Sequence, residues 1–341
     1  MDKLKENRAL NEQEIKEGKT ILRSMPAKLI VTLSSKCNVR CIMCEVRHTS
    51  WNIPGKTVAE ITSLFPYLES ISWQGGEVFF LDSFEPVFDE AKKHKHMKQT
   101  IVSNGLLLND KWIEKITGTN MELALSIDGT TKEVYEKIRQ GSRFDVLMRN
   151  IGALNEARKK SNSSLLLRMH TVVMRSNYKQ MSEFVDLAKK CGFDALHLMP
   201  LWGKSNDSEN IFLSPDKAMT AELSSLLEKT EEKARGCGME LLNSLPITRT
   251  AVDTADTGCK KEEYKGLRCY LPWKQMNIDP GGGLRPGCSC KTSAGQVQEN
   301  SVLELWNGPI MQEYRKTLLN STGSLCARNC FEAGVDIPSK K

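Results

Sequence analysis

Three cysteines near the start of the chain have the spacing of an iron–sulfur ligand set. Cys37, Cys41 and Cys44 form the pattern C-x3-C-x2-C inside LSSKCNVRCIMCEVR, just after an apolar run. Three thiolates on one short loop can hold three irons of a [4Fe–4S] cluster, and the missing fourth thiolate leaves one iron open to another ligand. Zinc is the alternative, but a zinc site usually takes four ligands in paired C-x2-4-C knuckles. The spacing therefore favours a reactive iron–sulfur cluster.

This triplet, in this position, resembles the signature of the radical S-adenosylmethionine (SAM) superfamily. The resemblance implies that SAM binds the open iron through its amino and carboxylate groups. It also implies that an electron from the cluster splits SAM into methionine and a 5′-deoxyadenosyl radical. Cys37, Cys41 and Cys44 are then the cluster ligands at the catalytic centre.

Further residues resemble the SAM-binding positions of that superfamily. Gly75, Gly76 and Glu77 follow the strand-like run SISWQ, and glycines at a strand end let the backbone approach a ligand closely. The resemblance implies that this GGE motif receives the SAM ammonium group. Other SAM contacts implied in the same way lie at or beyond the later strand ends: Asn104, Ser126, Asp128, Arg139, Met174 and Met199. The alternatives are turn capping for the Asn and Asp residues, a solvated arginine, and core packing for the methionines.

Strand-like and helix-like segments alternate from Pro26 onward. Most strand-like segments are nearly continuous apolar runs, as expected for a parallel sheet. These runs cover 27–33, 70–74, 99–103, 122–127, 165–174 and 195–200. Six such units predict an α/β fold, a partial (β/α)6 TIM-like barrel, which the resemblance also implies. Barrels of this type keep their chemistry at the carboxyl ends of the strands, and the cysteine triplet directly follows the first strand.

A second group of cysteines lies near the end of the chain. Cys269 and Cys288 form C-x13-G-x4-C with Gly283, and Cys326 and Cys330 follow after LELWNG. This arrangement resembles the auxiliary-cluster region of SPASM and twitch domains, and it implies one auxiliary [4Fe–4S] cluster held by those four cysteines. A full SPASM pattern would carry more cysteines, so a second auxiliary cluster is not expected. A zinc site with the same ligands is the alternative.

Five other residues have open roles. Cys259 and Cys290 are rival ligands or hydrogen-atom donors, between which the sequence does not choose. His170 and Arg168 alternate along one strand and face the same side, where they could contact substrate, although a structural histidine is the preferred interpretation. Asp279 precedes Pro280 and three glycines and is expected to be a turn residue.

The composition is that of an ordinary globular protein. The chain has 341 residues, 40% hydrophobic and 26% charged, as is ordinary for a globular enzyme. Eleven cysteines without a secretory signal favour metal ligands in a reducing, cytoplasmic compartment. The net charge of +6 and the absence of recognised modules predict neither nucleic-acid nor membrane binding. The predicted organisation is an N-terminal helix, the barrel, the auxiliary-cluster domain and a tail, covering 1–25, 26–244, 245–335 and 336–341.

The resemblance leaves two substrate classes open. One is a peptide that is crosslinked, oxidised or epimerised, and the other is a small molecule such as an aminoglycoside-type sugar. Only about 25 residues precede the barrel, which weakens the peptide hypothesis, yet the breadth of the family still favours it. A flavodoxin- or ferredoxin-type reductant is the expected electron donor. An iron–sulfur carrier or sensor that does not cleave SAM, or a zinc-stapled barrel, is disfavoured by the triplet and the GGE turn.

Overall fold

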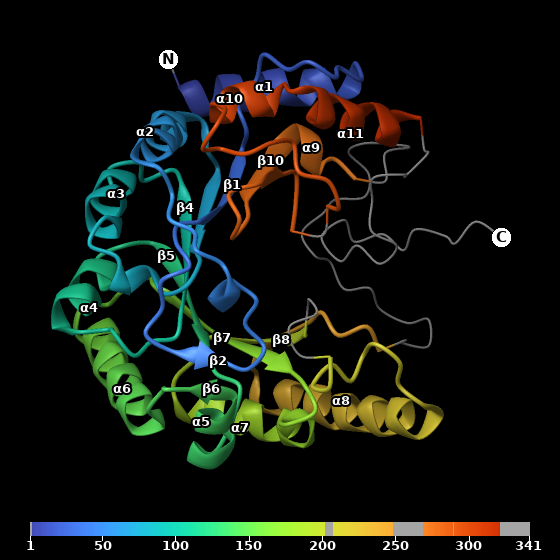
Figure 1. Ribbon diagram of the computed structural model, residues 1–341. Helices are drawn as coiled ribbons and strands as arrows, with labels where there is room; N and C mark the ends of the chain where they lie inside the picture. The colour runs from blue at the N-terminus through green and yellow to red at the C-terminus, as the bar shows by residue number, and fades with distance from the viewer. Residues whose placement is uncertain (1, 202–206, 248–268, 289, 321–341) are drawn as a thin grey trace.

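The chain is built around one sheet of nine strands. The computed structural model describes residues 2–201, 207–247, 269–288 and 290–320 (Figure 1). The strand order is β11-β10-β1-β3-β4-β5-β7-β8-β9, and every neighbouring pair is parallel except β10 and β11. These strands are β1 (Lys28–Thr32), β3 (Ser70–Gln74), β4 (Lys98–Ser103), β5 (Met121–Ser126), β7 (Leu166–Val173), β8 (Ala195–Pro200), β9 (Glu240–Asn243), β10 (Gln275–Ile278) and β11 (Leu284–Arg285).

The six predicted strands are present, and the partial barrel is confirmed. They are β1, β3, β4, β5, β7 and β8, in chain order across the sheet. The sequence did not predict that β10 pairs with β1, in a register that places Lys28 beside Gln275. Residues 275–278 are all buried there, so the C-terminal region continues the barrel sheet at its first edge. The domain bounds given above stay a prediction.

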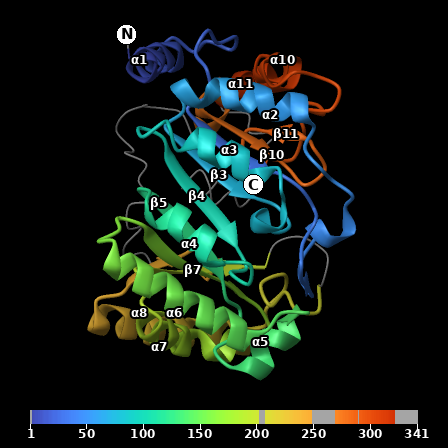
Figure 2. The same ribbon diagram turned by 90° about the vertical axis from the view of Figure 1, so that its left-hand side faces the viewer.

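Helices cover the outer face of the curved sheet, as Figure 2 shows from that side. The helices of the described residues are α1 (Lys3–Lys16), α2 (Gly55–Leu64), α3 (Phe84–Ala91), α4 (Asp110–Thr117), α5 (Lys132–Ile138), α6 (Phe144–Lys160), α7 (Met181–Lys190), α8 (Lys217–Cys237), α9 (Leu271–Lys274), α10 (Val302–Trp306) and α11 (Pro309–Leu319). Within the described part of the chain, none of them is long and apolar enough to cross a membrane.

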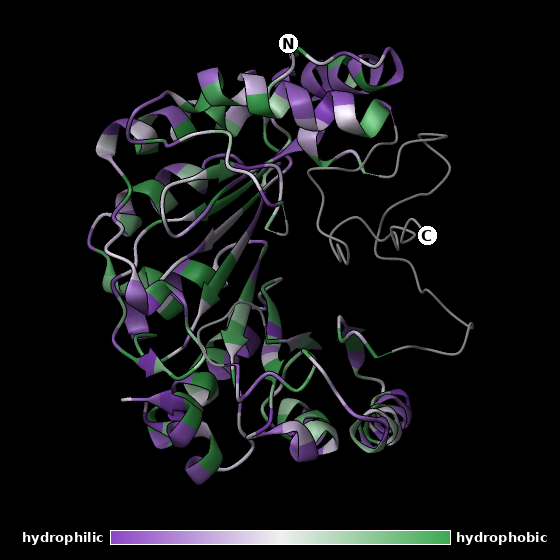
Figure 3. Cartoon of the chain, turned by 45° about the vertical axis from the view of Figure 1, so that its right-hand side comes forward, coloured by the Kyte–Doolittle hydropathy of each residue, from purple (hydrophilic) through white to green (hydrophobic). Residues whose placement is uncertain are grey.

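Strand alternation divides the side chains between the two faces of the sheet. On β7, Leu167, Met169 and Val173 are buried in the hydrophobic core against the helices. Arg168 and His170 lie between them in sequence and therefore point to the opposite, concave face. Hydrophobic residues concentrate along the strands, while the helices are largely hydrophilic on their outer sides (Figure 3).

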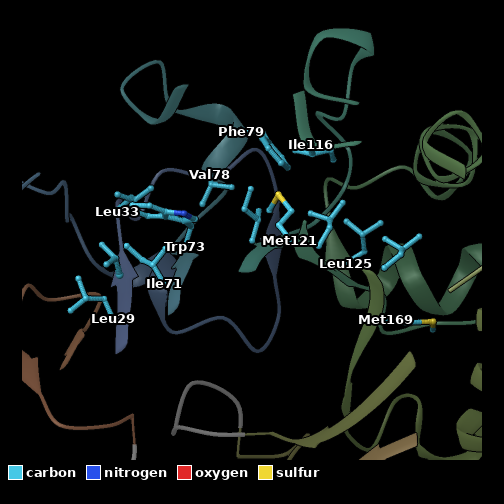
Figure 4. Close-up of a cluster of buried hydrophobic side chains, with 14 of the residues drawn as sticks. Leu29, Leu33, Ile71, Trp73, Val78, Phe79, Ile116, Met121, Leu125 and Met169 are labelled. Atoms are coloured by element: carbon cyan, nitrogen blue, oxygen red, sulfur yellow. The ribbon is translucent and has the colours of Figure 1, made fainter. Parts of the chain in front are cut away.

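The core lies between the sheet and the outer helices (Figure 4). Trp73 is fully buried on β3, and its indole nitrogen donates to Gln99 Oε1 over 3.0 Å. Its ring meets Phe65 and Phe84 edge to face. Phe79 packs in the same core, with its ring 4.8 Å from that of Trp112. Because Phe79 lies two residues after Glu77, this packing fixes the end of the loop that follows β3.

The N-terminal segment packs against the last described helices at one end of the barrel (Figure 1). The N-terminal helix, predicted to cover residues 1–25, is shorter in the structure. It ends at Lys16, and Gly18 with a φ of 66° takes the left-handed conformation that ends helices. Arg315, buried on α11, donates from its guanidinium to the carbonyl oxygens of Thr20, Pro272 and Trp306. One side chain therefore joins three segments that are far apart in sequence.

Candidate active site

The cysteine triplet lies on a loop that directly follows β1. A two-residue strand, β2 (Arg40–Cys41), pairs with β6 (Arg139–Gln140) in antiparallel register and holds the loop across the barrel mouth. Cys41 is buried, whereas Cys37 and Cys44 are half-buried. The Cys44 amide donates to the Cys41 carbonyl over 3.2 Å, so the last two cysteines share one turn. The sequence predicted this grouping from spacing alone.

The three cysteines fit an iron–sulfur cluster in donor type and in their place after β1, while no three potential ligands among the described residues, the triplet included, converge on a single metal-ion position. Burial raises the pKa of the Cys37 thiol, and it raises the pKa of Cys41 to about 11, with Arg139 opposing the shift. Without a metal these groups are therefore neutral thiols, and binding of iron would displace their protons. A raised pKa argues against a nucleophilic role for these two cysteines.

Gly75 and Gly76 bring the end of β3 against the start of the cysteine loop. The Gly76 amide donates to Ser34 O over 2.6 Å, and the Glu77 amide donates to Lys36 O over 2.9 Å. A Cβ on Gly75 would lie 2.5 Å from Ser34 O, and one on Gly76 would overlap the Lys36 carbonyl group. Only glycine allows this approach. Contact of these residues with SAM stays a prediction. Their packing against the loop is a second reason why both positions are glycine.

Glu77 is buried, and its carboxylate is bonded within the chain. It accepts hydrogen bonds from Ser103 Oγ and from the Asn104 amide, each over 2.8 Å. Burial raises the pKa of Glu77, and these hydrogen bonds oppose the shift. The Asn104 side chain in turn donates to Asn38 Oδ1 over 2.8 Å and lies 3.8 Å from Cys37 Sγ. Glu77 thus positions Asn104 beside the first cysteine.

Asp128 and Arg139, both predicted SAM contacts, form a buried ion pair. Arg139 Nη2 lies 2.6 Å from Asp128 Oδ2. The other carboxylate oxygen accepts from the Val172 amide over 2.8 Å. Arg139 Nη1 donates to Cys41 Sγ over 3.6 Å. The pair therefore contacts a cysteine of the triplet directly, which the sequence did not reveal, because the two residues were compared only with SAM-binding positions.

The other predicted SAM contacts lie on nearby strand ends. Ser126 ends β5, is half-buried and faces the concave side beside His170 in register. Met199 is half-buried on the same side of β8, beside Val172. Met174, which directly follows β7, is fully buried. Their contact with SAM stays a prediction.

Polar side chains line the concave face below this site. Arg168 pairs with Glu122 on β5 over 2.9 Å. The His170 and His197 rings stack edge to face at 5.2 Å, and His197 Nε2 lies 2.8 Å from Ser244 Oγ. Burial lowers the pKa of His170 to about 3 and that of His197 to about 4. Arg168 and His170 were predicted to share one face, whereas their partners Glu122 and His197 were not predicted, although period-two alternation along the strands places them there.

The second cysteine group is described only in part. Cys269 is half-buried, Cys288 is exposed, and Asn277 Nδ2 donates to Cys288 Sγ over 3.4 Å. Three cysteines assigned or considered there lie outside the described residues: Cys259, Cys326 and Cys330. Among the described residues no cluster of three or more potential metal ligands forms. The assignment of the auxiliary ligands therefore stays a prediction.

Asp279 is a turn residue, as expected from the sequence. Its carboxylate accepts from the amides of Gly281 and Gly283 over 2.8 and 2.9 Å, and it lies 3.0 Å from Arg285 Nε. It therefore closes the turn between β10 and β11.

Two family models match this chain. One describes the radical SAM superfamily and matches residues 31–187; the other, SPASM, describes an iron–sulfur cluster-binding domain and matches residues 269–331. The first range contains the cysteine triplet, the GGE motif and Arg139. The second contains all four predicted auxiliary ligands.

Curated relatives match at low identity. An AdoMet-dependent heme synthase of Methanosarcina barkeri is 23% identical over 201 residues, which cover 56% of this chain and 55% of that protein. A cysteine-type anaerobic sulfatase-maturating enzyme of Clostridium novyi is 26% identical over 202 residues, or 52% of each chain. The chain thus spans about half the length of the curated relatives it matches.

A solved structure supports the same fold. Streptococcus suis SuiB bound to its precursor peptide SuiA aligns with a TM-score of 0.65 at 17% identity, covering 90% of this chain and 70% of that one. The radical SAM domain implies SAM and a [4Fe–4S] cluster, and the SPASM domain implies auxiliary iron–sulfur clusters. The chain therefore contains a radical SAM superfamily domain over residues 31–187 and a SPASM iron–sulfur cluster-binding domain over residues 269–331.

Proposed function

We propose that the protein reductively cleaves SAM and abstracts a hydrogen atom from a peptide substrate held at the barrel mouth. The observation that supports this most is the loop of Cys37, Cys41 and Cys44, packed against Gly75 and Gly76 at the carboxyl ends of the strands. When bound, the cluster and SAM supply the electron and the 5′-deoxyadenosyl radical. The chain supplies position and shields the reacting groups from water.

The concave face is proposed to receive the substrate. Glu122, Arg168, His170 and His197 present charged and neutral polar groups there, below the cysteine loop. The two imidazoles are neutral at physiological pH because burial lowers the pKa of each ring. They can therefore accept a hydrogen bond from a polar group of the substrate.

A peptide substrate is supported by relatives rather than by a bound ligand. SuiB is solved with a precursor peptide, and the Clostridium novyi relative is named as maturing a sulfatase. A small molecule is the second candidate, supported by the relative that is named as a heme synthase. An aminoglycoside-type sugar belongs to that second class. The low net charge of +6 does not separate the two.

The remaining parts of the function are proposals of the same kind. An auxiliary [4Fe–4S] cluster, held by Cys269, Cys288, Cys326 and Cys330, would take the electron left on the substrate radical or anchor the substrate. A flavodoxin- or ferredoxin-type protein would deliver the electron for SAM cleavage, in the cytoplasm.

SAM cleavage is the direct test. Anaerobically reconstituted protein is reduced with dithionite in the presence of SAM, and 5′-deoxyadenosine and methionine are quantified by mass spectrometry. We expect both products from the wild-type protein and from a Cys191→Ala control, whose thiol lies at the end of α7. The triple variant C37A/C41A/C44A should form neither. Intact SAM in the wild-type sample would refute the proposal.

Substrate class is tested with the same assay. Deuterated peptides and deuterated aminoglycoside sugars are supplied in parallel, and deuterium in 5′-deoxyadenosine identifies the class from which hydrogen is abstracted. Label from the sugars alone would overturn the peptide assignment and leave SAM cleavage standing.

A further inference from the structure

The buried guanidinium of Arg139 touches one thiol of the cysteine triplet. Nη1 donates to Cys41 Sγ over 3.6 Å, and Nη2 lies 2.6 Å from Asp128 Oδ2. Both side chains are almost fully shielded from solvent, since Asp128 is 0% exposed and Arg139 is 7% exposed. We propose that Arg139, oriented by Asp128, raises the reduction potential of the cluster that Cys41 helps to bind. This inference rests on the proposed cluster at the triplet.

The backbone fixes the guanidinium against this sulfur. In the β2–β6 pair, Cys41 lies directly opposite Arg139, and the Ile42 amide donates to Ile138 O over 2.9 Å on the adjoining position. From the other side of the loop, Arg47 donates to the Cys41 carbonyl over 3.0 Å. The distance between the arginine and the sulfur is therefore set by strand pairing and not by a flexible side chain alone.

Asp128 determines which way the guanidinium points. Its Oδ1 accepts from the Val172 amide over 2.8 Å, which leaves Oδ2 facing Arg139. A buried charge needs a partner of opposite sign, and each of these two residues supplies the other's. Arg139 lies between the Asp128 carboxylate and the Cys41 sulfur. The charge closest to the sulfur is therefore the positive charge of the guanidinium.

The sulfurs of the other two cysteines have weaker side-chain donors beside them. Cys37 lies 3.8 Å from the neutral amide nitrogen of Asn104. For Cys44, no side-chain donor to the sulfur is found among the described residues. A cationic donor on a cluster sulfur stabilises the reduced state, which carries one more negative charge, and hydrogen bonds to the sulfurs are among the determinants of cluster potential. The structure therefore assigns the main tuning contact to Cys41.

The test uses variants that change the charge with opposite signs. EPR-monitored redox titration, in the absence of SAM, follows the signal that is lost in C37A/C41A/C44A. In Arg139→Gln we expect the ratio of reduced to oxidised cluster to fall by about tenfold at fixed ambient potential, which is about 59 mV for a one-electron couple. In Asp128→Asn we expect a shift in the opposite direction, since Arg139 then lacks its counter-charge.

Two further variants keep the test decisive if a single variant folds poorly. Asp128→Asn combined with Arg139→Gln places two uncharged amides in the same space and should follow Arg139→Gln. Arg139→Lys keeps the charge and should recover part of the potential. Arg168→Gln is the matched control, because it removes another interior arginine of an ion pair, one that has no recorded contact with a cysteine of the triplet.

Three outcomes would overturn the inference. The first is an unchanged potential in the double variant when its iron content is normal. The second is a shift of the same sign for Asp128→Asn and Arg139→Gln, which a purely structural role would produce. The third is the absence of a redox-active cluster at the triplet in the wild-type protein, which would refute the proposed function as well. A potential that changes only when SAM is present counts as the first of these outcomes, because the titration is made without SAM.

Discussion

Replacing Gly76 by alanine tests how the barrel holds the cysteine loop. The added Cβ would overlap the Lys36 carbonyl oxygen and lie 2.5 Å from the Lys36 carbonyl carbon. Because carbon atoms pack at about 3.5 Å or more, the loop has to move by about 1 Å. That movement strains the bonds from the Gly76 and Glu77 amides, 2.6 and 2.9 Å long, to Ser34 and Lys36. Loss of both bonds costs about 1–3 kcal/mol, and the overlap itself costs a similar amount.

We therefore expect Gly76→Ala to lower the free energy of unfolding by about 3 kcal/mol. Lys36 directly precedes Cys37, so the variant should also retain less iron after reconstitution. Urea unfolding of the metal-free protein measures the first effect, and iron analysis measures the second. Gly152→Ala is the matched control: the same change is made inside α6 with nothing within 4 Å, and it should raise stability by about 0.5–1 kcal/mol. Equal unfolding midpoints for Gly76→Ala and wild type would refute the reasoning.

Three other perturbations have defined outcomes. Arg315→Met should cost about 3–5 kcal/mol in urea unfolding, because it leaves buried carbonyl groups without donors; wild-type stability would contradict the joining role of this residue. Trp73→Ala should cost about 3–5 kcal/mol, measured in the same way, since the ring is fully buried; a cost below about 1 kcal/mol would contradict its place in the core. Burial lowers the pKa of His170 to about 3 and that of His197 to about 4, from an ordinary value near 6.5. Between about pH 6.5 and pH 4 the unfolded chain thus binds protons that the folded protein does not, and stability falls as the pH falls, by up to about 1.4 kcal/mol per pH unit for each ring. The variant H170Q/H197Q should lose this slope in urea midpoints compared at pH 7 and pH 5, and an unchanged slope would contradict the burial of the rings.

The main strands could be predicted closely because their signal is local. Runs of apolar residues gave β3 and β8 at their observed bounds and β7 within one residue at each end. The pairing of β10 with β1 could not be predicted, because Gln275–Ile278 is a short run whose partner lies far away in the sequence. The first helix was predicted too long because Gly18 was not used as a stop signal.

The site was predictable where spacing within one segment carries the chemistry. The cysteine triplet and the GGE turn were found in this way, and the superfamily resemblance is confirmed by the family models. Contacts between segments were not predictable. Neither the approach of Gly76 to Lys36 nor the contact of Arg139 with Cys41 has a signature in a single sequence. The inward-facing His197 was not predicted, although strand alternation places it on the same face of β8 as Met199.

Iron content and EPR of the reduced protein test the central claim most directly. The anaerobically reconstituted wild type is compared with C37A/C41A/C44A, with and without SAM. We predict about eight irons in the wild type and about four in the variant, corresponding to one [4Fe–4S] cluster in each cysteine group. SAM should perturb only the EPR signal that the variant lacks. A variant that keeps all of its iron, or a wild-type signal that does not respond to SAM, would contradict the assignment of the triplet as the SAM-binding cluster site.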